Sequence, residues 1–260
     1  MAHGYIHGTD PSEQARLAEL NRRTNSWYVR FLGVAPGMRV LEVGSGLGIL
    51  AAAVAAAAEG VQVVGVERSP AQITAAVADP RVRYVQGDAH ALDFPDGSFD
   101  LVYARYVLEH VTQPERVLAE MRRVVKGGGR VAVCENDVTL FRIDPPCPAA
   151  DQVWAAFARY QATLGGDATI GRRLFRLLGQ AGLSRIELSV QPEVHWHGSQ
   201  DFTTWVENIV GNIDSARRGL VQSNFCTTAE IDRAVGELRE RIDDPSASSC
   251  FMWNLAAGIR

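Results

Sequence analysis

The stretch Val40-Leu41-Glu42-Val43-Gly44-Ser45-Gly46-Leu47-Gly48 decides the fold. Residues 40–43 are typical of a buried strand, and the glycines that follow indicate a turn where a ligand approaches the main chain. In dinucleotide sites, the N–H groups of such a turn and of the following helix bind polar ligand atoms. The spacing here is GxGxG, whereas the pyrophosphate fingerprint is GxGxxG. Because Glu42 adds a negative charge, the pattern suits a cationic ligand better than a diphosphate.

Short β-branched runs alternate with helical stretches from Arg39 onward, which is typical of βαβ units around a parallel sheet. The pattern predicts strands at residues 39–43, 61–67, 82–86, 99–103, 130–135 and 183–190. It predicts helices at residues 48–58, 70–78, 114–125 and 170–181. We expect the glycines at 127, 128 and 129 to end the third of these helices before its strand begins.

Four further blocks follow the glycine stretch in a fixed order, at residues 64–67, 86–89, 96–102 with 108–111, and 118–135. The first ends at Glu67, the second holds Asp88 and Ala89, and the third ends in Leu108-Glu109-His110-Val111. In order and spacing, the set resembles the motifs of the class I S-adenosylmethionine-dependent methyltransferases. The resemblance covers residues 39–135 closely and the flanking segments hardly at all.

The resemblance implies an α/β fold of the Rossmann-like, doubly wound kind. Its sheet would be mostly parallel and seven-stranded, with residues 250–259 as the last, antiparallel strand, and helical additions would cap it. The cofactor would be S-adenosyl-L-methionine and the product S-adenosyl-L-homocysteine. Glu67 would accept hydrogen bonds from the ribose hydroxyls, and Asp88 would face the adenine. The full set of expected cofactor-binding residues is Glu42, Gly44, Ser45, Gly46, Gly48, Glu67, Arg68, Asp88, Ala89 and Arg105.

Catalysis then requires a side chain that aligns the acceptor and, for a phenol, indole or amine, removes its proton. The candidates are His110 after the fourth strand, His195 in the later chain, and Tyr28 and Tyr106, which we expect to flank the pocket entrance. Packing is the alternative role for His110 and the two tyrosines, and metal ligation, for which no third ligand is apparent, is the alternative for His195. No set of metal ligands is apparent, so we expect no metal.

Composition limits the partners. The net charge is −4 and no basic stripe is present, which disfavours nucleic acid. The chain shows neither a secretory signal nor an apolar run long enough to span a bilayer. We expect a cytoplasmic monomer or homodimer without a membrane partner. The resemblance implies that it methylates O, N or C of a small molecule, which we expect to be aromatic or heteroaromatic.

We expect three regions: a helical lid at residues 1–38, a core at 39–194 plus 249–260 with an insertion at 137–165, and a helical substrate cap at 195–248.

The alternatives to a methyltransferase are a non-methylating enzyme or binding module that uses the same cofactor, and a nicotinamide-dependent reductase. The reductase is disfavoured because a short-chain reductase needs Tyr and Lys four residues apart. Lys126, the sole lysine, has Arg122 at that offset.

Overall fold

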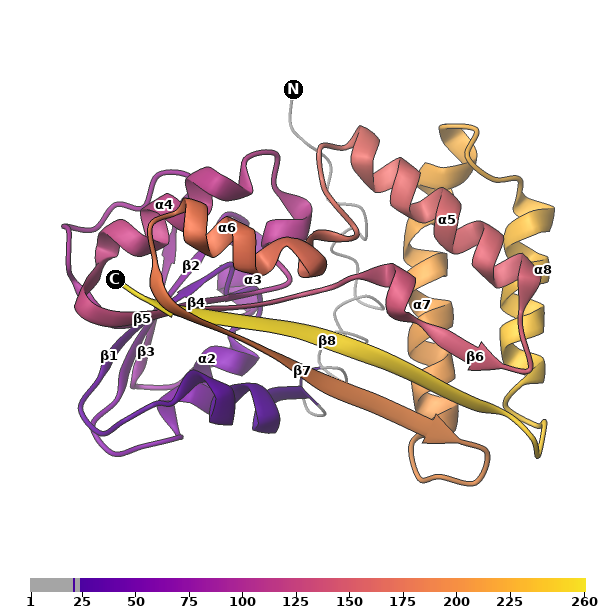
Figure 1. Ribbon diagram of the computed structural model, residues 1–260, viewed down its shortest axis with the longest axis horizontal. Helices are drawn as coiled ribbons and strands as arrows, with labels where there is room; N and C mark the ends of the chain where they lie inside the picture. Colours follow the sequence, from indigo (N-terminus) through magenta and orange to yellow (C-terminus); the bar gives the residue numbers. More distant parts are fainter. Residues whose placement is uncertain (1–20, 22–23) are drawn as a thin grey trace. The chain divides into compact units, whose positions relative to one another are not determined.

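The computed structural model describes residue 21 and residues 24–260 (Figure 1). The described chain forms two compact units. Residues 21–135, 170–190 and 254–260 make up one, here called the sheet unit, and residues 136–169 and 191–253 belong to the other, the helical unit. Most of the predicted lid at residues 1–38 lies outside the described residues. The three predicted regions stay a prediction.

The sheet unit contains the doubly wound sheet that the sequence predicts. Its parallel strands follow the order β3-β2-β1-β4-β5 and span Arg39–Val43 (β1), Gln62–Glu67 (β2), Val82–Gln86 (β3), Phe99–Arg105 (β4) and Val125–Glu135 (β5). The end of β8 (Ser248–Ile259) runs antiparallel beside β5, with Arg130 opposite Ile259. The start of β7 (Ser184–Trp196) pairs with β8 on its other side. The predicted fold class is thus confirmed, but with β6 (Arg142–Asp144) the sheet of the described residues has eight strands, where seven were predicted.

Helices cover both faces of this sheet. Figure 1 shows α4 (Pro114–Val124) and α6 (Leu174–Gln180) on one face and α2 (Ile49–Ala55) on the other; α3 (Pro70–Ala75) follows β2. Two 3-10 helices, η1 (Leu108–His110) and η3 (Ile170–Arg173), complete the unit, together with the helical residues 24–32. Pro114 starts α4 at a position where its missing N–H leaves no bond unmade.

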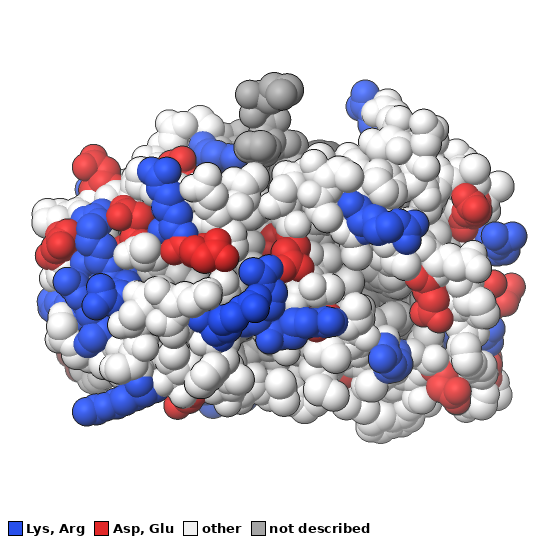
Figure 2. Space-filling model, turned by 45° about the horizontal axis from the view of Figure 1, so that its top comes forward, with Lys and Arg blue, Asp and Glu red and all other residues white. Residues whose placement is uncertain are grey.

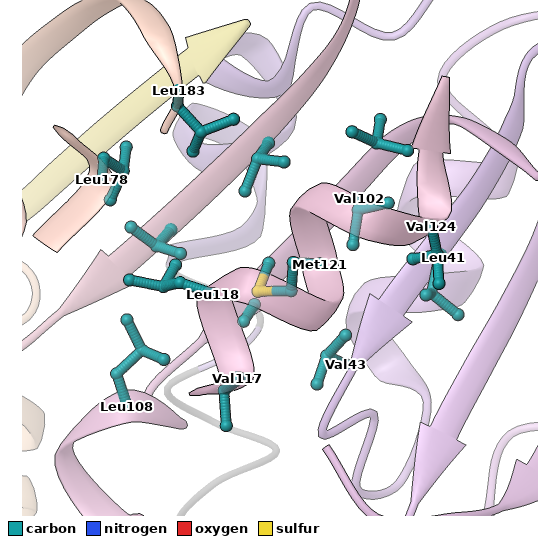
Figure 3. Packing of buried hydrophobic residues seen from close by; sticks show 14 of the residues in the cluster. Leu41, Val43, Val102, Leu108, Val117, Leu118, Met121, Val124, Leu178 and Leu183 are labelled. Carbon is teal, nitrogen blue, oxygen red and sulfur yellow. The ribbon is translucent and has the colours of Figure 1, made fainter. Parts of the chain in front are cut away.

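The core of the sheet unit lies between α4, α6 and the sheet. Helix α4 buries Val117, Leu118, Met121 and Val124, a spacing that lines one helical face. Figure 3 shows these side chains against Leu41, Val43 and Val102 of the strands and Leu178 and Leu183 of the α6 region. Burial of each such side chain contributes on the order of 2 kcal/mol to the stability of the fold. The apolar face of α4 therefore holds in place the strand ends that carry the site.

The structure differs from the prediction at the three glycines after α4. Strand β5 begins at Val125 and includes them. Phe99 lies opposite Val125 while Leu101 lies opposite Arg130, so the glycines form a bulge against β4. Gly128 has a φ of 78°, which a side chain rarely adopts. A glycine run therefore marks an irregular strand here as well as the end of a helix.

The helical unit is built from α5 (Pro148–Thr163), α7 (Phe202–Gln222) and α8 (Thr228–Glu240), which pack on one another (Figure 1). It also holds η2 (Val138–Leu140), and β6 (Arg142–Asp144), which pairs with the start of β8. A capping box between Thr227 and Glu230 starts α8. Among the described residues, no helix has both the length and the apolar content to span a membrane. Basic and acidic side chains are mixed on the face in Figure 2.

Candidate cofactor site and active site

In the loop after β1, glycines leave the main chain uncovered by side chains. Gly44 and Gly48 have φ values of 74° and 71°, in the left-handed region that favours glycine. The N–H groups of Gly44 and Ser45 both donate to the carbonyl of Val66, at 2.8 and 3.0 Å. A Cβ on Gly44 would lie 2.5 Å from Cγ2 of Val107, and one on Gly48 would overlap the Tyr84 ring. Neither position can accept a side chain without movement of its neighbour.

Glu67 closes this loop from the end of β2. Its Oε2 accepts the N–H of Gly46 at 3.1 Å, and its Oε1 accepts the N–H of Ser69 at 2.8 Å. Ser69 in turn caps α3, since its hydroxyl accepts the N–H of Gln72 at 3.4 Å. Each carboxylate oxygen has a further lone pair for a hydroxyl donor. The ribose contact of Glu67 stays a prediction, and these bonds show what orients its carboxylate.

Glu42 lies buried at the end of β1, with 3% of its surface exposed. Among the described residues its Oε2 has no hydrogen-bond partner, and neither has Oγ of Ser45. Burial raises the pKa of Glu42 to about 8, and the positive charge of Arg105 only partly opposes this. Two buried acceptors beside a bare loop fit a ligand that carries an ammonium group and hydroxyls, as S-adenosylmethionine does.

The carboxylate of Asp88 forms hydrogen bonds within its own loop after β3. Its Oδ1 accepts the N–H of His90 at 2.9 Å and lies 2.7 Å from Nδ1 of the same residue. The backbone N–H of His90 is the main cause that lowers the pKa of Asp88. Ala89 is half-buried and Arg68 is exposed. The cofactor contacts predicted for these three residues stay predictions.

Arg105 at the end of β4 is held by side chains of residue 21 and of the helical residues 24–32. Its guanidinium donates to Oγ1 of Thr24 at 3.0 Å, to Oδ1 of Asn25 at 2.9 Å, and to Asn21. The same group lies over the rings of Tyr28 and Tyr106. No local pattern in the sequence predicted these partners, and the predicted contact of Arg105 with the cofactor stays a prediction.

Tyr28 and Tyr106 lie beneath this arginine. Tyr28 is fully buried, and its hydroxyl donates to the carbonyl of Ala104 at 2.8 Å. Burial raises the pKa of both phenols well above 10, so neither is a ready proton acceptor near neutral pH. The contacts of Tyr28 favour a packing role, and the catalytic role predicted for each tyrosine stays a prediction.

His110 ends η1, directly after the buried Glu109. Its Nε2 lies 3.2 Å from Oε1 of Glu109. The helix η1 is fixed by Glu135 of β5, which is fully buried and which the prediction missed. Glu135 accepts the N–H groups of Val107, Leu108 and Glu109 at 3.1, 2.9 and 3.1 Å. Burial and then the Glu109 carboxylate raise the pKa of Glu135 well above 4.5. An acidic residue that ends an apolar strand was the available signal.

His195 belongs to the helical unit. Its Nε2 lies 2.8 Å from Oε1 of Glu193, and its ring stacks on Trp205 at 5.3 Å between centroids. The indole of Trp253 donates to the other oxygen of Glu193 at 3.3 Å. A carboxylate that orients an imidazole is typical of general bases and of structural histidines alike. The catalytic role predicted for His195 stays a prediction.

Comparison with known proteins shows to which family the chain belongs. A model described as a methyltransferase domain matches residues 41–133. Phosphatidylethanolamine N-methyltransferase of Cereibacter sphaeroides is 33% identical over 157 residues, which cover 58% of this chain and 71% of that protein. The chain belongs to the class I S-adenosylmethionine-dependent methyltransferases. Demethylmenaquinone methyltransferase of Renibacterium salmoninarum is 38% identical to this methyltransferase over 115 residues, 44% of this chain and 48% of that protein.

Solved structures agree with the fold of this class I methyltransferase. A candidate methyltransferase from Bacillus halodurans C-125 superposes with a TM-score of 0.60 at 19% identity, covering 91% of this chain and 98% of that one. The predicted cofactor, S-adenosyl-L-methionine, follows from the family. This methyltransferase spans about half the length of several curated relatives that it matches.

Proposed function

We propose that this methyltransferase transfers the methyl group of S-adenosyl-L-methionine to O, N or C of a small molecule by direct in-line displacement. The observation that carries the proposal is the bare loop at residues 44–48, closed by Glu67 and flanked by the unpaired acceptor of Glu42. A loop without side chains lets a nucleoside lie directly against the main chain. The family of the chain supports the same reading.

The chain's own residues would hold the cofactor in this way. Glu42 would pair with its ammonium group, Glu67 with its ribose hydroxyls and Asp88 with its adenine. The bound sulfonium supplies an electrophilic methyl group. The protein then has to orient the acceptor and exclude water.

A proton acceptor adds about a hundredfold or more when the acceptor is a phenol or amine. We assign this role to His110, because the neighbouring Glu109 orients its imidazole and Glu135 fixes the backbone that carries both. A histidine exchanges its proton near neutral pH. His195, with Glu193 beside it, is the second candidate.

The acceptor molecule we propose is aromatic or heteroaromatic. One relative is named for demethylmenaquinone, a ring compound, and another for phosphatidylethanolamine, an amine-bearing phospholipid. The first supports a ring acceptor, and the second keeps nitrogen as an acceptor atom. The cytoplasmic location and the monomeric or dimeric state stay predictions.

Calorimetry tests the cofactor. S-adenosylhomocysteine should bind with measurable heat and raise the melting temperature, whereas NADH should do neither. Incubation with labelled S-adenosylmethionine and a metabolite extract, followed by mass spectrometry, then identifies the methylated product. Heat from NADH but not from S-adenosylhomocysteine would overturn the proposal.

A further inference from the structure

The sheet unit leaves three large apolar side chains on its surface where α6 turns into β7. Phe175 is 57% exposed, Leu188 59% and Val190 54%. Well-packed soluble domains rarely expose several such side chains together. None of the three belongs to the cofactor site described above.

These side chains lie on one side of the unit. A Cβ on Gly179 of α6 would lie 3.7 Å from Cδ1 of Ile186, so the two elements touch there. The chain reverses between them; Phe175 is one turn before Gly179, and Leu188 and Val190 follow Ile186 on the same strand face. All three therefore extend in the same direction from that contact. We call them, with Arg172 and Arg176, the α6–β7 patch.

The chain around α6 is rich in arginine, although the net charge of the whole chain is −4. Residues 170–180 contain three arginines, Arg172, Arg173 and Arg176, and no acidic residue. Glu115 of α4 lies 3.7 Å from Arg173. Arg172 and Arg176 are exposed on either side of Phe175 in the sequence. An exposed aromatic ring between arginines is the composition that binds at a lipid–water interface.

The patch extends toward the carboxyl ends of the parallel strands. Oγ of Ser184 donates to the carbonyl of Ile259, which places the start of β7 beside the end of β8. The two strands are therefore antiparallel. Because β8 is also antiparallel to β5, β7 runs parallel to β5. Val190, near the end of this stretch of β7, therefore lies toward the edge of the sheet that carries the glycine loop. Helix η3, just before α6, contacts η1.

We infer that the α6–β7 patch docks the protein reversibly on the surface of an anionic phospholipid bilayer. This departs from the expectation of no membrane partner and does not depend on the proposed methyl transfer. Three half-exposed side chains fall well short of the roughly 800 Å² per partner that a stable protein–protein interface buries. A few apolar side chains with arginines beside them suffice for reversible binding to anionic lipid.

Vesicle co-sedimentation tests the inference with the full chain. The protein should sediment with vesicles of phosphatidylcholine and phosphatidylserine, remain in solution with phosphatidylcholine alone, and be released by added salt. The Phe175→Ser/Leu188→Ser variant should bind about tenfold more weakly, and so should Arg172→Gln/Arg176→Gln. As matched controls, Val77→Ser and Arg83→Gln, which change exposed residues elsewhere in the sheet unit, should bind as the wild type does.

The same variants distinguish lipid docking from misfolding and from dimerisation through the patch. Each should keep the melting temperature and the S-adenosylhomocysteine affinity of the wild type, which shows that it is folded. Failure of the wild type to sediment with anionic vesicles would overturn the inference, as would wild-type binding by both double variants. Light scattering supplies the remaining test. A dimer that becomes a monomer in the Phe175→Ser/Leu188→Ser variant would assign the patch to a second copy of the chain and overturn lipid docking.

Discussion

The carboxylate of Glu135 in β5 accepts the main-chain N–H of Leu108 in η1 at 2.9 Å, although 27 residues separate them. Val107 and Glu109 donate to the same carboxylate. The first donors of η1, which have no partner within a helix that short, are therefore bound by an acid from a neighbouring strand. Val107 in turn lies against Gly44 of the cofactor loop. Glu135 thus connects the glycine loop to Glu109 and His110.

Glu135→Gln should slow methyl transfer about tenfold or more and destabilise the fold by about 1–3 kcal/mol. The amide can turn one oxygen toward η1, but its NH₂ group then opposes an N–H donor. Single-turnover rates and urea unfolding measure the two effects. The control is Glu59→Gln at an exposed acid. Equal rates and equal stability in both variants would remove Glu135 from the positioning of η1.

Local patterns predicted the sheet better than the site. Short runs rich in β-branched residues placed β1 and β3 at their observed bounds, because such residues favour a pleated strand. The three bonds of Glu135 and the partners of Arg105 join residues far apart in the sequence. No periodicity encodes such pairs. The bulge at the glycines after α4 and the burial of Tyr28 depend on neighbouring elements in the same way.

Glu67→Ala should weaken the affinity for S-adenosylhomocysteine by roughly 1.5–3 kcal/mol. The substitution removes the acceptor for the ribose hydroxyls and the acceptor that holds Gly46 and Ser69. Titration calorimetry measures the change. Glu59→Ala, at an exposed position, controls for the loss of one negative charge. An affinity equal to that of the wild type would rule out the ribose role.

Gly48→Ala should destabilise the protein by about 1–3 kcal/mol or more, since a Cβ there is strained and also meets the Tyr84 ring. Two glycines serve as controls. Gly37 has a φ of 74° with nothing near a Cβ, so Gly37→Ala measures the strain alone. Gly127 has neither feature, and Gly127→Ala should change little. Urea unfolding compares the three. If Gly48→Ala matches Gly37→Ala, the Tyr84 contact has no energetic effect.

Glu42 should make the stability of the ligand-free protein depend on pH. Its pKa is about 8 in the folded chain against an ordinary 4.5, so the folded state holds a proton that the unfolded state has lost between these values. The free energy of unfolding should therefore fall as the pH rises through that window. Glu42→Gln, which stays neutral, should show a smaller fall. Melting temperatures across the window measure this, and parallel profiles for the two proteins would show that Glu42 titrates normally.

The position of β8 between β5 and β7 has a consequence for synthesis. Glu135 pairs with Asn254, a residue 119 positions later in the chain. While the ribosome makes the intervening helices, the outer edge of β5 exposes unpaired N–H and C=O groups, and β7 has no neighbour to pair with. Strands β1 to β5 can assemble early, but the nascent sheet stays open on that side until β8 emerges. Aggregation through the exposed edge is the hazard of this interval, and a chaperone that shields strand edges would protect the chain during it.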